Sequence, residues 1–146
     1  MQIRTKGIPD NVSKAICKDS LRFYGQELLG RRLYKNIKLF VVFEKLPNPI
    51  NALCQWSDDN HKCREFTIIV NKKLNKKTTL IALAHEMVHV KQYAKGELKD
   101  YLRNDKVKWC GKVYCFSKIK YWSSPWEKEA YKKDILLYEQ YKQSKK

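Results

Sequence analysis

The 146-residue sequence contains no apolar run approaching the roughly 20 consecutive residues that a membrane-spanning helix needs. Residues 1–6 also lack the apolar stretch that follows the basic start of a secretory signal peptide. The first absence argues against a membrane protein, and the second argues against export. We therefore expect an intracellular, cytoplasmic protein that has no membrane partner.

Cysteine is present in an odd number, five, and no two cysteines have the C-x-x-C spacing. The odd count argues against a full disulfide framework. Cys54, His61 and Cys63 are candidates to share a second, structural metal with Cys110 and Cys115, although the spacings are not those of a zinc ribbon or knuckle. For Cys110 and Cys115 we favour free thiols, or a pair across a hairpin.

Acidic residues are scarce beside basic ones, with 15 Asp and Glu against 31 Lys and Arg and a formal net charge of +16. Residues 1–60 carry 10 basic and 6 acidic side chains (+4), whereas residues 61–146 carry 21 and 9 (+12). Such a charge favours polyanions, either DNA or an acidic partner protein. The sequence shows no basic-aromatic signature of a named nucleic-acid module, so solubility with unselective polyanion binding is an equal alternative.

The length and the hydrophobic content of 43% suit one domain spanning residues 1–146. The hydrophobic patterning predicts an α+β fold with an N-terminal helix, a small twisted sheet and a C-terminal helix. The expected elements are helices at 11–29, 79–95 and 125–141, strands at 37–44 and 65–71, a hairpin of 106–109 and 112–116, and a frayed end at 142–146.

The most informative motif is His85-Glu86-Met87-Val88-His89, an H-E-x-x-H pentapeptide that holds two of the three histidines. Histidines four apart on a helix lie about one turn from each other on the same face, so both imidazoles can bind one Zn²⁺. Glu86 is then placed to take a proton from the attacking water, which is the general-base role in metal-assisted hydrolysis.

The helix predicted to carry the motif is apolar in its first half. Thr78 or Thr79 can cap its N-terminus, and Gly96 can end it. We expect such a helix to be buried. Burying two histidines and a glutamate costs free energy unless these side chains have partners, and a bound metal would provide one. The alternative is a surface helix on which His85 and His89 are solvated.

A catalytic zinc site typically needs a third protein ligand and leaves one position for water. Gln92 and Lys95 stand where metzincins have glycine and histidine, so that pattern is excluded. Glu127, near the start of the last predicted helix, is our preferred third ligand. Glu129 and His61 are the alternatives.

Glu127 also has an interpretation that involves no metal. Ser124, Pro125 and Glu127 fit a capping box with proline at the first helical position. In that arrangement the carboxylate of Glu127 hydrogen bonds to the start of its own helix. Glu129 has the corresponding alternative of a solvent-facing helix residue.

The motif His85-Glu86-x-x-His89 with Gln92, followed by Pro-Trp-Glu-Lys-Glu-Ala at 125–130, resembles the small gluzincin-type and SprT-like zinc metallopeptidases. The resemblance covers roughly residues 65–135. In gluzincins two helix histidines and a glutamate from a later helix bind zinc, and this glutamate often begins a Glu-x-x-Ala unit. Glu127 and Ala130 match that unit. The resemblance implies a minimal zincin-like fold whose C-terminal helix supplies the glutamate.

The same resemblance carries implications for the substrate. Strand 66–71 would be the edge strand against which an extended substrate lies. SprT-like members suggest substrates that are proteins bound or crosslinked to DNA. Two features depart from these families: Tyr131 stands where gluzincins commonly have an acidic residue, and the chain lacks the C-x-x-C pairs of a zinc ribbon.

Aromatic residues are expected around the site. We expect three tryptophans to pack as a wall beneath it: Trp109, Trp122 and Trp126. Three tyrosines are candidates to donate a hydrogen bond to the developing oxyanion, with ordinary packing as their alternative: Tyr114, Tyr121 and Tyr131.

These observations predict a zinc metallopeptidase that hydrolyses peptide bonds of a protein or peptide substrate. His85, His89 and Glu127 would bind one Zn²⁺, and Glu86 would deprotonate the water that the metal activates. The alternative is a non-catalytic protein on a zincin scaffold that binds nucleic acid or an acidic partner through its basic surface.

Overall fold

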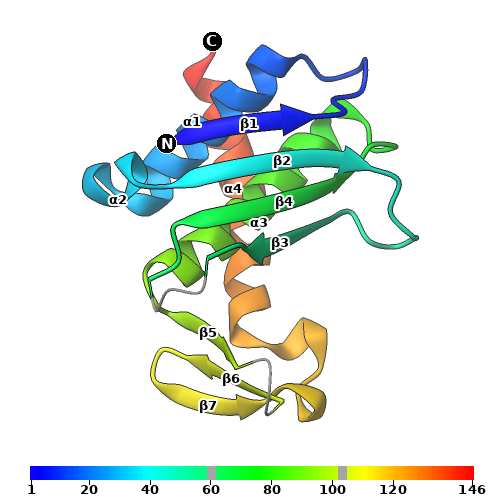
Figure 1. Cartoon of the computed structure of the whole chain (residues 1–146). Coiled ribbons are helices and arrows are strands. Elements are labelled where there is room, and N and C mark those ends of the chain that lie inside the picture. The colour runs from blue at the N-terminus through cyan, green and yellow to red at the C-terminus, as the bar shows by residue number, and fades with distance from the viewer. Residues whose placement is uncertain (59–61, 102–104) are drawn as a thin grey trace.

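A four-stranded sheet forms one layer of the molecule, which a computed structural model describes for residues 1–58, 62–101 and 105–146. Its strands are β1 (Gln2–Lys6), β2 (Lys38–Glu44), β3 (Ala52–Trp56) and β4 (Glu65–Asn71), in the spatial order β1-β2-β4-β3. β1, β2 and β4 are parallel, whereas β3 pairs antiparallel with β4 and forms one edge (Figure 1).

The buried side of this sheet follows from alternation along β2 and β4. Leu39, Val41 and Phe43 of β2 are buried, and the residues between them are partly or fully exposed. β4 repeats the pattern, and the register places the buried residues of the two strands beside each other as Leu39–Phe66, Val41–Ile68 and Phe43–Val70. One face of the sheet therefore forms half of the main core.

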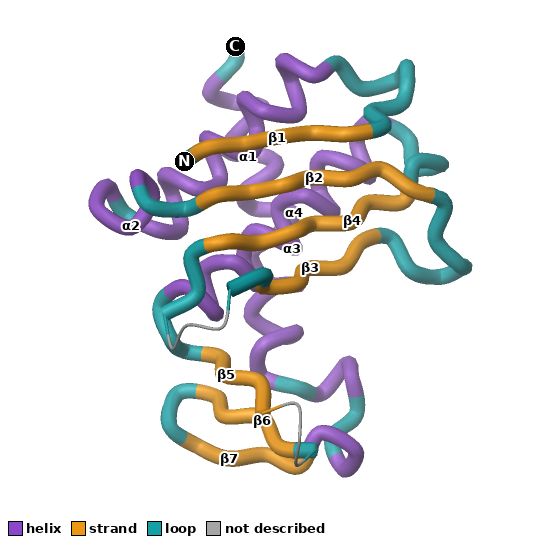
Figure 2. Tube along the Cα trace, viewed as in Figure 1, coloured by secondary structure: helices purple, strands orange, loops and turns teal. Residues whose placement is uncertain are grey.

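Three long helices cover that face, as Figures 1 and 2 show. They are α1 (Lys14–Leu29), α3 (Lys76–Ala94) and α4 (Pro125–Ser144), and a short helix α2 (Arg31–Lys35) follows α1. Side chains cap the N-termini of α1 and α3. Ser13 accepts a hydrogen bond from the backbone N–H of Ile16 in α1, and Asn75 accepts one from the backbone N–H of Thr78 in α3. The tyrosine hydroxyl of Tyr24 on α1 donates to the carbonyl of Leu80, which ties α1 to α3.

A second, three-stranded antiparallel sheet lies at one end of the molecule. It comprises β5 (Leu98–Tyr101), β6 (Lys106–Trp109) and β7 (Lys112–Cys115) and is followed by two single-turn helices, η1 (Phe116–Lys118) and η2 (Tyr121–Ser123). Its buried core consists of Leu98, Val107 and Trp126, the last contributed by the first turn of α4. The start of α4 therefore joins the two sheets.

The structure confirms the α+β class, strand 65–71, the hairpin with its turn at Cys110 and Gly111, and strand 37–44 to within one residue. The helix boundaries needed correction. α1 begins at Lys14 because a turn closed by the Val12 N–H and the Pro9 carbonyl precedes it. α3 begins at Lys76 because Asn75, rather than Thr78 or Thr79, is its cap, and α4 continues through Ser144 instead of fraying at 142.

The assignment of the edge strand was wrong. Strand 66–71 is β4, which lies between β2 and β3, and the edge strand is β3. Three strands, β1, β3 and β5, and the short helix α2 were not predicted from the sequence. In the part of the chain that the structure describes, no helix combines the length and apolar character needed to cross a membrane.

Candidate metal centre

Two helices bring three potential metal ligands together. His85 and His89 lie on successive turns of α3, and Glu127 lies in the first turn of α4. One ligand atom from each falls within 4.8 Å of the others, and the three residues are only 7%, 8% and 5% exposed. Among the described residues, this is the group of His, Cys, Asp and Glu side chains that could hold a metal ion.

The Glu127 carboxylate lies between the two imidazoles. Its Oε1 atom is 3.0 Å from Nε2 of His85, and its Oε2 atom is 3.0 Å from Nε2 of His89. The two imidazole rings are 5.0 Å apart between centroids. Both histidines therefore present Nε2, not Nδ1, to the glutamate.

Each histidine is oriented by an acceptor on its other nitrogen. Nδ1 of His85 is 3.1 Å from Oδ2 of Asp134 on α4, and Nδ1 of His89 is 2.8 Å from Oε1 of Gln92 on α3. An acceptor at Nδ1 favours the tautomer that carries its proton there, which leaves the Nε2 lone pair free to bind a metal. The pattern is the one that metal-ligating histidines usually show.

The electrostatics of the cluster are strongly coupled. Burial lowers the pKa of His85, but hydrogen bonds with Asp134 and Glu127 outweigh that effect and raise the pKa to about 9. For Glu127, burial raises the pKa, and the hydrogen bonds with His85 and His89 more than reverse this, so that its pKa falls to about 2. In the absence of a metal, a buried carboxylate thus needs a positive charge beside it.

The residues present fit a zinc ion. With both histidines neutral and protonated at Nδ1, two nitrogen lone pairs and a carboxylate face one another in a buried space. Three converging acceptors repel unless a proton or a cation lies between them. Two histidines and one glutamate also form one of the ligand sets of catalytic zinc sites, which leave a further position open.

Glu86 is buried on α3 between the two histidines in sequence and is 5% exposed. Burial raises its pKa, and the neighbouring His89 and His85 oppose the shift without cancelling it. A raised pKa brings a carboxylate closer to neutral pH, where it can both accept and return a proton.

A polar network behind His89 connects α3 to α4. The amide nitrogen of Gln92 donates to the carbonyl of Trp126 and to the Glu129 carboxylate, both at 2.9 Å. The ammonium of Lys91 lies 2.9 Å from Glu129 and 2.8 Å from Glu97. Gln92 is completely buried, so these contacts fix its carbonyl oxygen toward His89.

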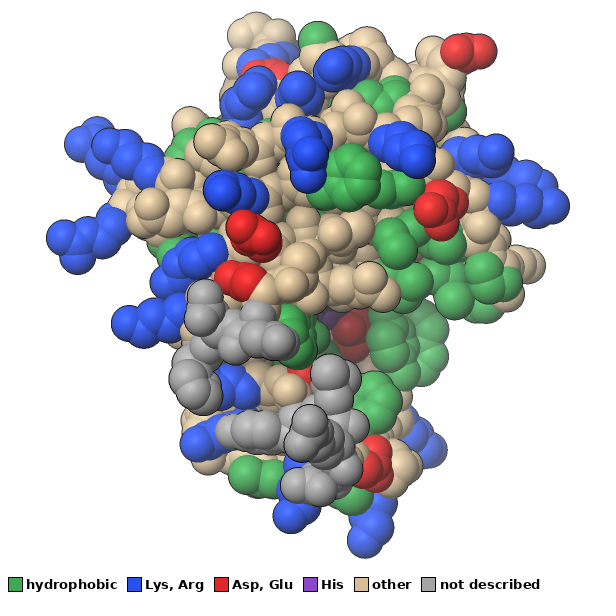
Figure 3. All heavy atoms as spheres, in the orientation of Figure 1, with side chains coloured by type: hydrophobic (Ala, Val, Ile, Leu, Met, Phe, Trp, Pro, Cys, Tyr) green, Lys and Arg blue, Asp and Glu red, His purple; other side chains and the backbone are tan. Residues whose placement is uncertain are grey.

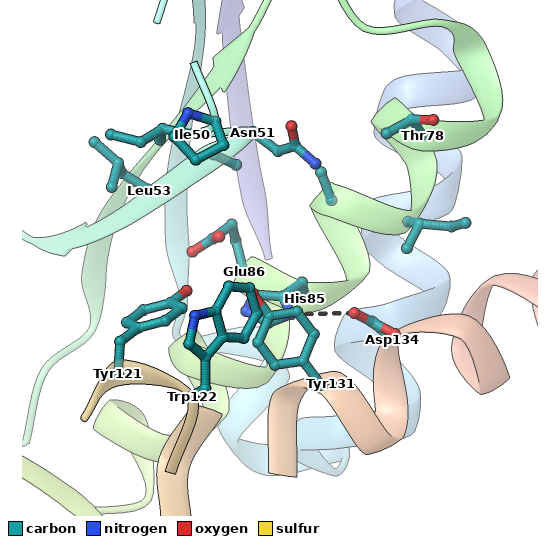
Figure 4. Close-up of a pocket in the computed structure, with 14 residues that line it drawn as sticks. Ile50, Asn51, Leu53, Thr78, His85, Glu86, Tyr121, Trp122, Tyr131 and Asp134 are labelled. Atoms are coloured by element: carbon teal, nitrogen blue, oxygen red, sulfur yellow. Dashed lines mark hydrogen bonds and ion pairs between the residues drawn. The ribbon is translucent and has the colours of Figure 1, made fainter. Parts of the chain in front are cut away.

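A cavity of about 650 Å³ opens beside His85 and Glu86. Figure 4 shows Glu86 projecting from α3 on the side of the wall formed by Ile50, Asn51 and Leu53, whereas His85 projects toward Tyr131 and Asp134. The opposite wall is aromatic: Tyr121 and Trp122 come from η2, and Tyr131 comes from α4. In the space-filling view, a hollow that contains histidine and acidic side chains lies beneath the sheet (Figure 3).

The aromatic wall differs from the predicted one. Trp122 is not core: it is 70% exposed and stacks on Tyr131, with ring centroids 5.3 Å apart. Tyr131 in turn packs on the His85 ring at 4.4 Å. Trp126 and Trp109 do pack against each other, but in the core of the small sheet.

The three tyrosine candidates fall in two places. Tyr121 and Tyr131 line the cavity, whereas Tyr114 packs on Trp126 in the small sheet and is not part of the cavity lining. Burial raises the pKa of Tyr121, and a hydrogen bond with Tyr131 raises it further. The Tyr121 hydroxyl therefore keeps its proton at neutral pH and remains a hydrogen-bond donor.

The alternative ligands are not in the cluster. Glu129 is engaged by Lys91, Gln92 and Lys133, so it is neither a ligand nor a solvated helix residue. The capping box is absent, because the Ser124 hydroxyl donates to the Tyr121 carbonyl instead of accepting from α4. His61 lies outside the described residues.

The proposed second metal site gains no support from the described residues. No group that includes a cysteine converges as metal ligands among them. Cys110 and Cys115, on the hairpin of the small sheet, form no disulfide, in agreement with free thiols.

Two contacts at the site were not predicted from the sequence, those of Asp134 and Gln92 with the outer histidine nitrogens. Asp134 lies seven residues after Glu127, a spacing of two helical turns that places both carboxylates on one face of α4. That spacing was the available signal. Gln92 was noted only as the residue that excludes a metzincin, although its position three after His89 puts it within reach on the same helix.

Comparison with known proteins identifies no relative: no protein-family model, no curated protein and no solved structure matches the chain.

Proposed function

We propose that the protein is a zinc-dependent metallopeptidase. His85, His89 and Glu127 hold the metal, and Glu86 is the general base. The observation that carries the proposal is the convergence of two Nε2 atoms and a carboxylate within 4.8 Å, with both Nδ1 atoms already facing acceptors. A mere surface helix with an accidental H-E-x-x-H sequence would not explain two buried histidines supplied with a third ligand from another helix.

The arrangement of the elements also supports this proposal. The motif helix α3 lies beneath β3, the edge strand, and the glutamate comes from the later helix α4. This arrangement supports the zincin-like fold that the resemblance to gluzincins implies, and the proposal gives β3 the role first assigned to residues 66–71. An extended peptide can pair with the free edge of β3 above the cavity.

The roles of the residues follow from their positions. When bound, zinc supplies a Lewis acid that makes water a competent nucleophile at neutral pH. Glu86 accepts the proton of the attacking water and returns it to the leaving amine, for which its raised pKa is suited. Tyr121, whose hydroxyl stays protonated, donates a hydrogen bond to the oxyanion that develops on the scissile carbonyl.

Elemental analysis of the purified protein tests the metal, and cleavage of unfolded casein tests the activity. We expect near-stoichiometric zinc in the wild type and in Glu86→Gln, and a large loss of zinc in Glu127→Ala. Casein cleavage should fall by about 10²–10⁴-fold in Glu86→Gln, which is the usual contribution of a general base.

A matched control separates the ligand role from a helix defect. Glu139→Ala removes an exposed glutamate from the same helix and should retain both zinc and activity. Circular dichroism of each variant checks that α4 remains folded. Zinc retained in Glu127→Ala would disprove the ligand role, and normal cleavage by Glu86→Gln would disprove the general-base role.

A further inference from the structure

Exposed apolar side chains gather at the cavity beside His85 and Glu86. Among the described residues, eight large hydrophobic side chains are exposed, and half of them line this cavity. These are Leu53, Tyr121, Trp122 and Tyr131. Single exposed apolar residues are normal on a protein surface, whereas a group of them around one cavity indicates a binding site for an apolar ligand.

The rest of the lining is also largely apolar. Ile50 and Leu53 form one wall with their aliphatic side chains, and Ile81 of α3 adds a third. Among the described residues that line the cavity, none is Lys or Arg, and the acidic ones are Glu86 and Asp134. An acidic substrate side chain would therefore lose its water and face carboxylates, whereas an apolar one would gain from leaving water.

Ring contacts hold the aromatic wall in one arrangement. The Trp122 ring stacks on Tyr131, with the ring centroids 5.3 Å apart and the ring planes at 30°. Tyr121 packs edge-on against Trp122 at 5.2 Å, and Tyr131 packs on the His85 ring at 4.4 Å. Trp122 is nevertheless 70% exposed. An aromatic surface that is already ordered and still open can contact a further ring with little additional loss of side-chain entropy.

We propose that this cavity receives an aromatic side chain of the substrate, from a residue next to the bond that is cleaved. This inference rests on the proposed peptidase function and adds the substrate preference. The ring would lie between the aliphatic wall at Ile50 and Leu53 and the aromatic wall at Trp122, in a cavity of about 650 Å³. Glu86 lines the same cavity (Figure 4), so the substrate residue that fills it adjoins the bond under attack.

The test uses fluorogenic peptides built around a bond that the enzyme cleaves in casein. One series varies the residue directly before the bond and a second series varies the residue directly after it, each through Phe, Leu, Ala and Glu. In one of the series we expect kcat/KM to be about 10–100-fold higher for Phe than for Ala, because burial of the side chain contributes on this scale. Phe should exceed Leu by about 2–10-fold, the usual gain from contact between aromatic rings. Glu should be cleaved more slowly than Ala.

Substitutions in the two walls separate contact between rings from general burial. Trp122→Ala should bring the Phe/Leu ratio of kcat/KM to about one, because the open aromatic surface is lost. Leu53→Ala, in the aliphatic wall, should lower kcat/KM for the Phe and Leu peptides together and leave their ratio unchanged. The control is Phe116→Ala, which removes an exposed ring of η1 outside the cavity lining and should change neither value.

The possible results separate this inference from the proposed function. Equal cleavage of the Phe and Ala peptides in both series, or a Phe/Leu ratio that Trp122→Ala leaves unchanged, would overturn the aromatic preference and leave the peptidase intact. Cleavage of neither the peptides nor casein would overturn the peptidase and this inference with it. If size-exclusion chromatography shows that Trp122→Ala converts a dimer to a monomer while the Phe/Leu ratio stays the same, the aromatic wall is an interface between copies of the chain and the inference is wrong.

Discussion

The four-stranded sheet with its helices has a large buried core, whereas the three-stranded sheet at the end of the molecule has a very small one. Within the described residues, the main core contains 26 buried residues from the larger sheet and its helices, whereas the small core contains three. The rings of Tyr114 and Trp109 pack on Trp126, with centroid distances of 5.9 and 6.4 Å, but both residues are only partly buried. The small sheet depends on the start of α4 for most of its packing.

The proposed metal ligands lie on both sides of this division. His85 and His89 are on α3. The residues beside them on this helix, Leu83, Ala84 and Met87, are fully buried in the main core. Glu127 follows Trp126, the largest residue of the small core. We infer that the main core alone holds the two histidines, whereas Glu127 lies between Trp126 of the small core and Ala130 of the main core and is held by both.

The largest expected effect comes from truncating the main core. Ile68→Ala, at a fully buried position on β4, should lower the free energy of unfolding by about 2–5 kcal/mol, because it leaves a cavity that a close-packed sheet cannot fill. Val107→Ala removes two methyl groups from the small core and should cost about 1–2 kcal/mol. Urea unfolding measures both.

The comparison would fail if the two variants lost the same global stability. It would be sharpened if Val107→Ala lowered the urea midpoint much less than Ile68→Ala does, while amide exchange accelerated mainly in β5–β7. That result would show local opening of the small sheet, separate from global unfolding.

The elements that could be predicted from sequence are those with strong local signals. The H-E-x-x-H helix, β2 and β4 carry their own apolar patterns, and their prediction needed no partner. β3 could not be found this way, because Ala52–Trp56 follows a proline-containing loop and becomes a strand through pairing with β4, as at Leu53 and Ile69. Its position at the edge is likewise a property of the sheet order and not of the segment.

The site likewise contains residues that a local sequence pattern predicts and residues that depend on how the helices pack. Helical spacing predicted that His85 and His89 share a face, and the Glu-x-x-Ala unit pointed to Glu127. The partners on the outer nitrogens depend on how α4 crosses α3, which no local pattern specifies, and Asp134 was therefore missed. The exposure of Trp122 has the same cause, since only the folded chain shows that this aromatic residue lines a cavity.

Removing the metal should expose the difference between the regions through pH. In the metal-free protein the pKa of His85 is raised from 6.5 to about 9, so its contribution to stability is complete below pH 6.5 and is lost as pH rises through about 9. The pKa of Glu127 is lowered from 4.5 to about 2, so its contribution is present above pH 4.5 and is lost as pH falls through about 2. The stability that His85 and Glu127 together contribute to the metal-free protein should therefore be greatest between pH 4.5 and 6.5.

Calorimetry and amide exchange measure this effect. Between pH 6.5 and 9 the melting temperature of the chelated protein should fall by roughly 5 °C or more, and that of the zinc-loaded protein should change little, because its ligands carry no protons to lose. Loss of amide protection should begin in β5–β7 and the first turn of α4. Equal pH dependence with and without zinc would show that the cluster does not bind the metal.

The smallest expected effect concerns the link that Gln92 makes between the two regions. Its carbonyl oxygen accepts from His89, and its amide donates to the Trp126 carbonyl beside Glu127. Gln92→Met keeps the length of the side chain but removes both hydrogen bonds, so we expect zinc affinity to fall by about 10–100-fold, as for other partners of metal-bound histidines. Zinc competition with a chromophoric chelator measures the affinity.

Asp134→Asn provides the matched comparison, because it alters the partner of His85 without touching the connection to Trp126. Both variants should weaken zinc binding, since each changes the acceptor that orients an imidazole. Only Gln92→Met should also accelerate amide exchange in β5–β7, because of the two residues only Gln92 donates a hydrogen bond to Trp126, a residue of the small core. Faster exchange in both variants would mean that the small sheet responds to the metal and not to the Gln92–Trp126 hydrogen bond.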